Sequence, residues 1–163
     1  MSRVPRRGLS RLMSRQTTAA DPDFAARVRA SFNRQQFMAT IGARLTRVDP
    51  GEADIEIAVR DDLAQQHGFL HAGVVAAVAD SACGYAALSL MPVGAAVLST
   101  EFKVNLLAPA AGDRIIARGR VIKAGRTLSV CMAEVSAVRG DEETLVATLV
   151  GTMMTVRDRG LVD

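Results

Sequence analysis

The sequence predicts an α+β protein in which a curved antiparallel β-sheet wraps around one long central helix, and three observations lead to this class. The residues from Val74 to Leu90 have the length and the alanine-rich composition of a helix and include no proline. This helix is apolar on nearly all sides, which is typical of a helix surrounded by protein. Strand-like segments joined by tight turns precede and follow it, and hairpins form only antiparallel sheets.

The segment before the central helix predicts one surface helix and one hairpin. An acidic start that contains Pro22 begins a helix from Phe24 to Met38, which is expected to dock on the body. The side chains expected on its docking face are those of Phe24, Val28, Phe32 and Phe37. Alternating apolar residues from Ala43 to Val48 and from Ala53 to Val59, on either side of a turn at residues 49–52, predict two paired strands.

The segment after the central helix predicts four strands. Their expected ranges are 97–107, 114–123, 127–138 and 144–156. Tight turns at 124–126 and 139–141 join the last three as hairpins. Simple alternation in the first of these strands predicts one face made of Leu98, Thr100, Phe102, Val104 and Leu106, and an opposite face made of Ser99, Glu101, Lys103 and Asn105.

The expected organisation is a single domain over residues 21–157 with a short tail at each end. A chain of 163 residues is long enough for one domain to bury a sizeable core. Residues 1–20 contain five arginines, no acidic residue and no apolar core of a secretory signal. We expect them to form a disordered tail, with a start at Met13 or a contact with an anionic partner as alternatives. Residues 158–163 are expected to fray.

Charge and cysteine content narrow the class of protein. Five of the 20 basic residues lie in the tail, so the body contains 15 basic and all 17 acidic residues. This balance of charge argues against a nucleic-acid surface. Cys83 and Cys131 lack metal-ligand spacing and are expected to be small buried side chains in a cytoplasmic protein. The charge of Asp80 and the strands that follow it argue against a membrane-spanning helix.

Asp80 is the only charged residue in the central helix. An ionised carboxylate is costly in an apolar setting unless it is paired, hydrogen-bonded or protonated. Asp80 could face solvent at a kink, cap a second helical segment that begins at Ser81, or bond to nearby backbone. Alternatively, the apolar setting raises its pKa toward the range that suits a catalytic base, and the residue is functional.

The start of the central helix gathers polar and small residues in the segment from Gln65 to Gly73. The first turn of a helix presents unpaired N–H groups and a partial positive charge, which together stabilise an oxyanion. The glycines, Gly68 among them, let a ligand approach the backbone closely. An oxyanion site near a carboxylate would suit acyl transfer. His67 and His71 have no Cys or acidic residue at zinc-ligand spacing, so no metal is expected.

One chain cannot easily bring the helix start and Asp80 to the same substrate atom. Ala72 and Asp80 are eight residues apart, which corresponds to roughly 12 Å along a helix at about 1.5 Å per residue. Two antiparallel helices related by a two-fold axis would place the start of one beside the middle of the other. The spacing therefore predicts a homodimer with two equivalent sites, each built from both chains.

At these residues the chain resembles the hotdog-fold acyl-CoA thioesterases, in particular the PaaI-like branch of the phenylacetate pathway. The pattern of that family is Asn or Gln, then His-Gly-Gly at a helix start, then an acidic residue eight positions after the first Gly. Here it reads Gln65, His71-Ala72-Gly73 and Asp80, and the similar order of elements extends from Ile41 to Val156. The resemblance implies a hotdog fold and hydrolysis of an acyl- or aryl-CoA thioester by a homodimer or a dimer of dimers, without a metal or redox cofactor and without a nucleic-acid or membrane partner.

The resemblance also implies roles for individual residues. Asp80 would be the general base or the nucleophile, and the N–H of Ala72, alone or with that of Gly73, would bind the thioester oxygen. Gln65 would help to position the reacting groups, beside the motif histidine His71. The residues expected to contact the substrate or the hydrolytic water are Gly68, Ser99, Thr100 and Arg126. For Arg126, a solvent-exposed turn is the alternative to a contact with CoA phosphates.

Two residues depart from the family pattern. Ala72 replaces a glycine, so its methyl group could narrow the site. Gly84 stands where some relatives carry Thr, so a hydroxyl that holds water must come from elsewhere. Two other functions stay open: a hotdog dehydratase or hydratase, and a non-catalytic acyl-CoA-binding protein, which the Ala72 departure favours.

Overall fold

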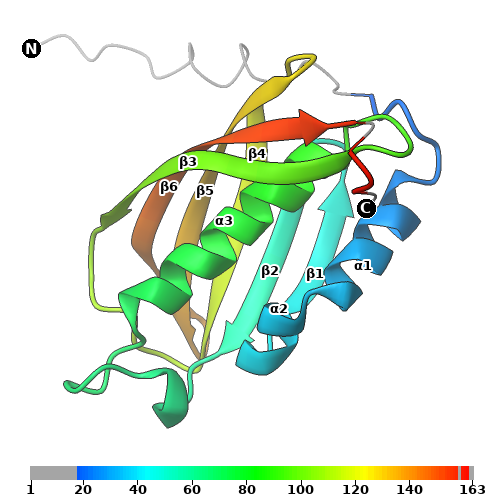
Figure 1. Cartoon of the computed structure of the whole chain (residues 1–163). Helices are drawn as coiled ribbons and strands as arrows, with labels where there is room; N and C mark the ends of the chain where they lie inside the picture. The colour runs from blue at the N-terminus through cyan, green and yellow to red at the C-terminus, as the bar shows by residue number, and fades with distance from the viewer. Residues whose placement is uncertain (1–17, 158, 162–163) are drawn as a thin grey trace, which may run out of the picture.

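The computed structural model describes residues 18–157 and 159–161, and a six-stranded sheet in it curves around one central helix (Figure 1). Every strand pairs antiparallel with its neighbours, in the order β1-β2-β4-β5-β6-β3. The strands are β1 (Arg44–Asp49), β2 (Glu52–Ala58), β3 (Ala96–Leu106), β4 (Arg114–Lys123), β5 (Leu128–Arg139) and β6 (Glu142–Val156). They begin and end within two residues of the predicted ranges, and the predicted α+β class is confirmed.

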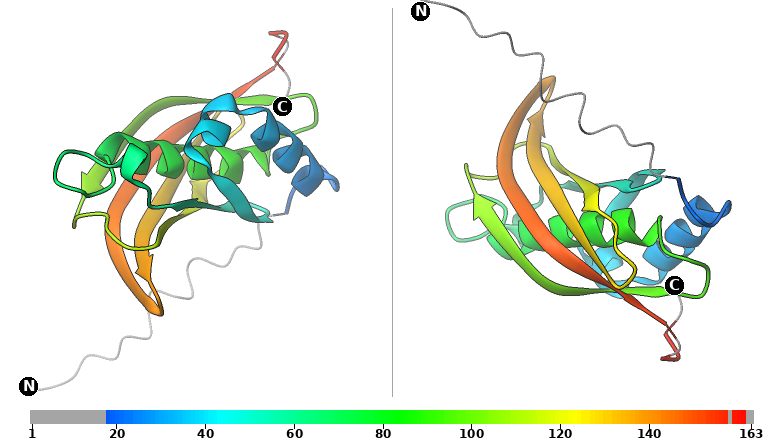
Figure 2. Two further views of the ribbon diagram at one scale, coloured as in Figure 1. Left: turned by 90° about the horizontal axis from the view of Figure 1, so that it is seen from below. Right: turned by 90° about the horizontal axis from the view of Figure 1, so that it is seen from above.

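The central helix, α3 (Ala72–Leu88), lies in the concave face of the sheet, as the two views in Figure 2 show. All of its residues from Ala82 onward are buried, because small side chains let the strands approach the helix closely. At Gly119 in β4 an added Cβ would lie only 2.4 Å from the backbone of Ala82, so only glycine fits at this crossing. The second half of α3 is thus held against the sheet, whereas Ala72 and Gly73 at its start are exposed.

The prediction of one continuous helix over residues 24–38 is wrong, because the helix breaks at Gln35. The two helices are α1 (Phe24–Arg34) and α2 (Gln36–Ile41). A continuous helix would turn Ile41 to the side opposite Val28, since about 3.6 residues complete one turn. The break lets both of these residues be buried, and it leaves Phe37, which was expected to dock, 55% exposed.

Buried polar contacts anchor α1 on the far end of α3. The Arg27 guanidinium pairs with Asp21, with 2.9 Å between Nε and Oδ2. Its Nη2 donates hydrogen bonds to the carbonyl oxygens of Met91 (2.8 Å) and Leu88 (3.3 Å). A cation is favoured at this position because the C-terminal end of a helix carries partial negative charge. These contacts therefore fix α1 to the core.

The predicted alternation of side chains in β3 is also wrong. In the pairing of β3 with β6, Ser99 lies opposite Met153 and Glu101 lies opposite Thr152, so Thr100 is an extra residue in a β-bulge. One extra residue moves every later side chain to the other face of the strand. The face of Ser99 is the one toward α3, since Met153 is buried. The later residues that share this face are Phe102, Val104 and Leu106.

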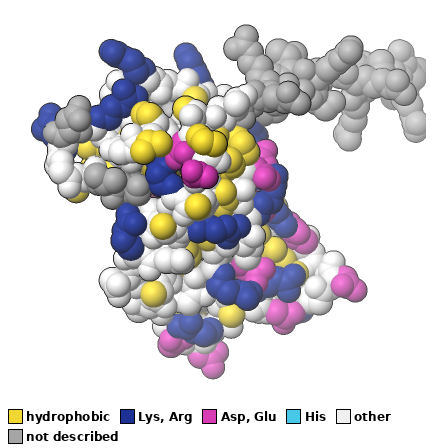
Figure 3. Space-filling model, turned by 90° about the vertical axis from the view of Figure 1, so that its right-hand side faces the viewer, with side chains coloured by type: hydrophobic (Ala, Val, Ile, Leu, Met, Phe, Trp, Pro, Cys, Tyr) yellow, Lys and Arg dark blue, Asp and Glu magenta, His cyan; other side chains and the backbone are white. Residues whose placement is uncertain are grey.

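Charged side chains on the body are interspersed and often paired. Figure 3 shows basic and acidic side chains side by side on one face of the protein, and the ion pairs include Arg44 with Glu56 and Arg118 with Glu143. No helix within the described ranges is long and apolar enough to cross a membrane. Residues 1–17 of the expected N-terminal tail, and residues 158, 162 and 163 of the C-terminal one, lie outside the described residues.

The close crossing of α3 and β4 can be tested with two glycine variants. Gly119→Ala is expected to lower the free energy of unfolding by about 1–3 kcal/mol, because the new methyl group meets the backbone of α3. Gly84→Ala is the matched control: a Cβ there meets nothing within 4 Å, and alanine in a helix is favoured by about 0.5–1 kcal/mol over glycine. Urea denaturation measures both changes. Equal stabilities of the two variants would contradict the close crossing.

Candidate active site

Asp80 lies half-buried in the middle of α3, beside the first residues of β3. The hydroxyl of Ser99 donates a hydrogen bond to Asp80 Oδ1 over 2.7 Å. Burial raises the pKa of Asp80 above the ordinary value for an aspartate, and the bond from Ser99 lowers it in part. The carboxylate is therefore a stronger base than a solvent-exposed one. The bulge at Thr100 matters here, because it lets Ser99 and the later apolar residues of β3, from Phe102 onward, all face α3.

A small pocket of about 70 Å³ adjoins the Asp80 carboxylate. The residues that line it are Gln35, Asp80, Ser81, Gly84, Tyr85, Val97 and Ser99. No described residue donates a hydrogen bond to Asp80 Oδ2, so this oxygen is available to an external donor. Gln35 was not predicted at the site. No sequence signal pointed to it, because its position depends on the break between α1 and α2.

The start of α3 presents one free backbone amide. His71 is the N-cap residue, and its Nδ1 accepts a hydrogen bond from the N–H of Gly73 over 2.9 Å. The N–H groups of Val74 and Val75 donate to the carbonyl oxygen of His71, at 2.9 and 3.2 Å. Among the amides of this first turn, only that of Ala72 donates to no described residue. Because Nδ1 is an acceptor, neutral His71 carries its proton on Nε2.

The loop before α3 is held by a turn around Gly68. The N–H of Gly68 donates to the carbonyl oxygen of Gln65 over 2.9 Å, and the positive φ of 81° at Gly68 favours glycine there. The side-chain oxygen of Gln65 accepts a hydrogen bond from the N–H of His67, and the N–H of Gln65 donates to the carbonyl oxygen of Phe69 over 2.8 Å. These bonds place Gln65 beside the helix start.

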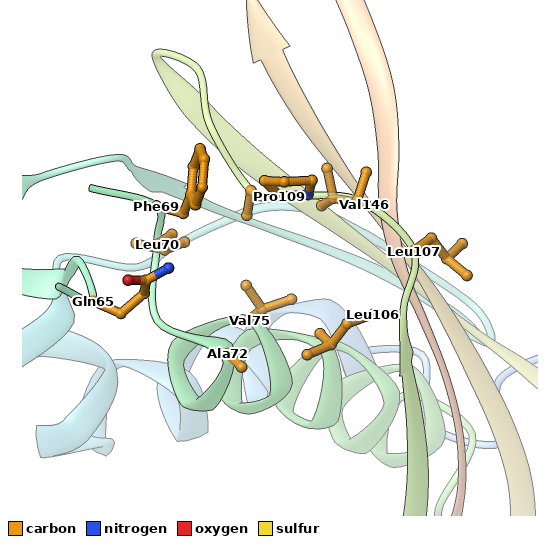
Figure 4. Close-up of a pocket in the computed structure, with 11 residues that line it drawn as sticks. Gln65, Phe69, Leu70, Ala72, Val75, Leu106, Leu107, Pro109 and Val146 are labelled. Carbon is orange, nitrogen blue, oxygen red and sulfur yellow. The ribbon is translucent and has the colours of Figure 1, made fainter. Parts of the chain in front are cut away.

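A larger and mostly apolar pocket, of about 400 Å³, lies between this loop, the start of α3 and the connection from β3 to β4 (Figure 4). It is lined by Gln65, Phe69, Leu70, Ala72, Val75, Leu106, Leu107, Ala108, Pro109, Ala110 and Val146. Figure 4 shows Gln65 and Phe69 on one side of the space and Leu106 and Leu107 on the other, with Ala72 at the helix start. The volume is in the range of small-molecule sites.

The structure divides the predicted site residues among several places. Ser99 and Asp80 share the small pocket, while Gln65 and Ala72 share the large one, and no residue lines both. Thr100 joins neither, because its hydroxyl donates to the carbonyl oxygen of Thr152 on β6 over 2.9 Å. His71 and Gly73 are exposed at the helix start, and Gly68 is exposed in the loop. Arg126 lies in a third pocket, of about 120 Å³, beyond the other end of α3, which Arg157 also lines.

The two cysteines are free and buried. Burial raises the pKa of both thiols, with smaller contributions from Cys131 and Asp80 at Cys83. Both are thus thiols and not nucleophilic thiolates at neutral pH. Within residues 18–157 and 159–161, no three His, Cys, Asp or Glu side chains lie close enough together to hold a metal ion.

A curved antiparallel sheet around a long helix, with an acid in mid-helix and an open amide at the helix start, defines a hotdog-fold protein. The family model described as the thioesterase superfamily matches residues 67–144. A crystal structure of a thioesterase family protein from Silicibacter pomeroyi is 51% identical, has a TM-score of 0.81, and is matched over 82% of this chain and 98% of that chain. The chain belongs to the thioesterase superfamily, so the predicted hotdog fold and the predicted class, a thioester hydrolase, are confirmed.

Two further matches are more distant. The PaaI protein from the phenylacetic acid degradation operon of E. coli shares the fold, with a TM-score of 0.74, 22% identity and coverage of 82% of this chain and 94% of that chain. A 1,4-dihydroxy-2-naphthoyl-CoA hydrolase from Listeria monocytogenes is 28% identical over 91 residues, which are 56% of this chain and 74% of that protein.

The bond from Ser99 is expected to control the protonation of Asp80. Ser99→Ala should raise the pKa of Asp80 further, because the lost bond stabilises the ionised carboxylate. Thr100→Val is the control, since that hydroxyl bonds to β6 and not to Asp80. NMR titration of the labelled carboxyl carbon measures the pKa in each protein. A pKa that is unchanged or lower in Ser99→Ala would contradict this account of the site.

Proposed function

We propose that the protein is an acyl-CoA thioesterase that hydrolyses an acyl- or aryl-CoA ester to a free acid and CoA. The observation that carries this proposal is the half-buried Asp80 carboxylate, with one oxygen bonded to Ser99 and the other available. Its setting favours a strong base, which is what activation of water requires. The membership of the thioesterase superfamily supports the reaction type, and the naphthoyl-CoA hydrolase among its relatives supports a CoA ester as the substrate.

The complete site is proposed to form between two copies of the chain. Three features support this. Ala72 and Asp80 line different pockets within one chain. Phe102 and Leu106, on the helix-facing side of the edge strand β3, are 45% and 55% exposed, so α3 of the same chain does not cover them. In the first half of α3 the small residues Gly73, Ala76 and Ala77 are exposed or half-buried, which allows a second helix to approach.

An antiparallel pair of α3 helices would cover these apolar side chains and bring the helix start of one subunit to the middle of the other. The thioester oxygen would then accept a hydrogen bond from the Ala72 N–H of the partner subunit, while Asp80 faces the thioester carbon. The mostly apolar pocket beside Gln65 and Ala72 would take the acyl group. Arg126 and Arg157 lie in the third pocket, beyond the C-terminal end of α3, and form no ion pair with any described residue. Both are therefore available to the CoA phosphates.

The chemistry follows from these positions. Asp80 takes a proton from water, and the water oxygen bonds to the thioester carbon. The Ala72 N–H stabilises the charge that develops on the carbonyl oxygen, a contribution that is worth about 100- to 1,000-fold in rate at comparable sites. Breakage of the carbon–sulfur bond then releases CoA, and Asp80 returns the proton to the sulfur. Direct attack by Asp80, followed by hydrolysis of the anhydride, needs the same groups and stays an alternative.

Asp80→Asn is expected to lower thioester hydrolysis by about 100-fold or more, because the amide cannot accept the proton of water. A thiol-release assay over short, medium, long-chain and aryl-CoA esters measures the loss. The variant should stay folded, and near neutral pH its unfolding midpoint should be equal to or above that of the wild type. The reason is that a raised pKa in the fold disfavours the ionised carboxylate, and asparagine removes this cost.

This gain in stability should vanish below a pH of about 4, where the aspartate is protonated in both the folded and the unfolded chain. Near-normal turnover of Asp80→Asn would remove this residue from the mechanism. Binding of CoA esters by the wild type without release of thiol would favour the non-catalytic binding protein instead, and gain or loss of water on the acyl chain of an intact thioester would favour the dehydratase or hydratase.

The shared site can be tested with Ala72→Pro. Proline replaces the N–H with a ring CH2 group and keeps the backbone path, because Ala72 is the first residue of α3, where proline is favoured, and His71 already has the extended backbone that precedes proline. Each variant homodimer should be almost inactive. An equimolar mixture of Asp80→Asn and Ala72→Pro chains, exchanged to equilibrium, should regain about a quarter of wild-type turnover, since half of the dimers then hold one intact site. A mixture that stays inactive would contradict sites shared between chains.

A further inference from the structure

The pocket beside Asp80 contains a side chain from outside the segment that the family model matches. Gln35 lies at the joint of α1 and α2, whereas the matched segment begins at residue 67. The backbone of Gln35 is used to form this joint: its N–H donates to the carbonyl oxygen of Phe32, and its carbonyl oxygen accepts from the N–H of Ala39. Its carboxamide forms no hydrogen bond with any described residue.

The joint is held firmly over the pocket. The ring of Phe32 meets that of Tyr85 edge-on, with 5.5 Å between their centres, and Tyr85 lines the same pocket. Arg27, one turn further back on α1, bonds to the carbonyl oxygens at the end of α3. The two ends of this contact fix α1 along α3, which places Gln35, itself an exposed residue, at the pocket.

The pocket has room for water. Its volume is about 70 Å³, and a cavity needs roughly 10–15 Å³ to hold one water. A well-held water needs two or more polar partners, and Asp80 Oδ2 is one of them. The helix itself offers no side chain one turn after Asp80, since Gly84 stands there and a Cβ on it would meet nothing within 4 Å. Gln35 borders the same pocket from α1 and α2, and its amide can both accept and donate.

We propose that Gln35 positions the hydrolytic water against Asp80, with its carboxamide oxygen accepting one O–H of the water while Asp80 Oδ2 accepts the other. The lone pair of the water oxygen is then left for the thioester carbon, and the proton that is lost goes to Asp80. This inference rests on the proposed thioesterase function. It adds a residue from the N-terminal helices to a reaction whose other groups lie on α3 and β3.

The test separates kcat from KM. Gln35→Ala is expected to lower kcat for CoA-ester hydrolysis about tenfold, the worth of one hydrogen bond, and to leave KM within about twofold. Gln36→Ala is the matched control, because Gln36 is the next residue and is exposed like Gln35 but does not line the pocket. The double variant Gln35→Ala with Gly84→Ser should recover much of the lost kcat, since the open space at Gly84 can hold a new hydroxyl beside Asp80.

The outcomes are distinct. Unchanged kcat in Gln35→Ala, in a wild-type background that releases thiol, overturns the role of Gln35 and leaves the proposed function intact. A lower kcat that comes with a lower unfolding midpoint and no recovery by Gly84→Ser indicates a structural role and also overturns it. Loss of kcat in Ser81→Ala but not in Gln35→Ala assigns the water to Ser81 instead. A wild type that hydrolyses no CoA ester overturns the proposed function and the water-holding role together.

Discussion

The hydrogen bond between Ser99 and Asp80 is the contact on which the rest of the site depends. A carboxylate in a half-buried helix must have a donor, and here the donor comes from a neighbouring strand. Ser99 reaches Asp80 only because Thr100 is an extra residue in β3. In a regular strand either Ser99 or the apolar residues that begin with Phe102 would face away from α3. The bulge therefore lets one strand offer both a polar group to the acid and an apolar surface beyond it.

The small residues of α3 set a second constraint. They let the sheet pack so closely that glycine is required at position 119, and they leave the helix with few functional side chains of its own. The chemistry available to this helix is a short carboxylate in its middle and a backbone amide at its start. His71 determines which amide remains open. Its ring Nδ1 accepts a hydrogen bond from the N–H of Gly73, and its carbonyl oxygen accepts those from Val74 and Val75. A helix built for close packing thus carries a site made mainly of backbone and one acid.

Much of the fold could be predicted from local sequence pattern. The two predictions that were wrong, the continuous helix at residues 24–38 and the regular alternation in β3, failed because packing in the folded chain determines both features. The strands and α3 follow from hydrophobic period and turn residues, and they lie within two residues of their predicted ranges. The bulge at Thr100 and the break at Gln35 have no local sign, since each is set by what lies opposite in the folded chain. The same limit applies to the site. Asp80 and the motif from His71 to Gly73 stand out in the sequence, whereas Gln35 lines the same pocket as Asp80 only because α1 packs on α3.

This anchor has a consequence for how such proteins diversify. The segment that the superfamily model matches begins at residue 67, while the tether between Arg27 and the end of α3 belongs to the preceding flank. The tether itself bonds to main-chain carbonyl groups and does not depend on the side chains of α3, whereas the contact of Phe32 with Tyr85 does. Changes to the flank that keep both contacts are therefore expected to leave α3 and the sheet in place. Under the proposed role of Gln35, the reactivity of such proteins can evolve through this flank as well as through the segment that the family model matches.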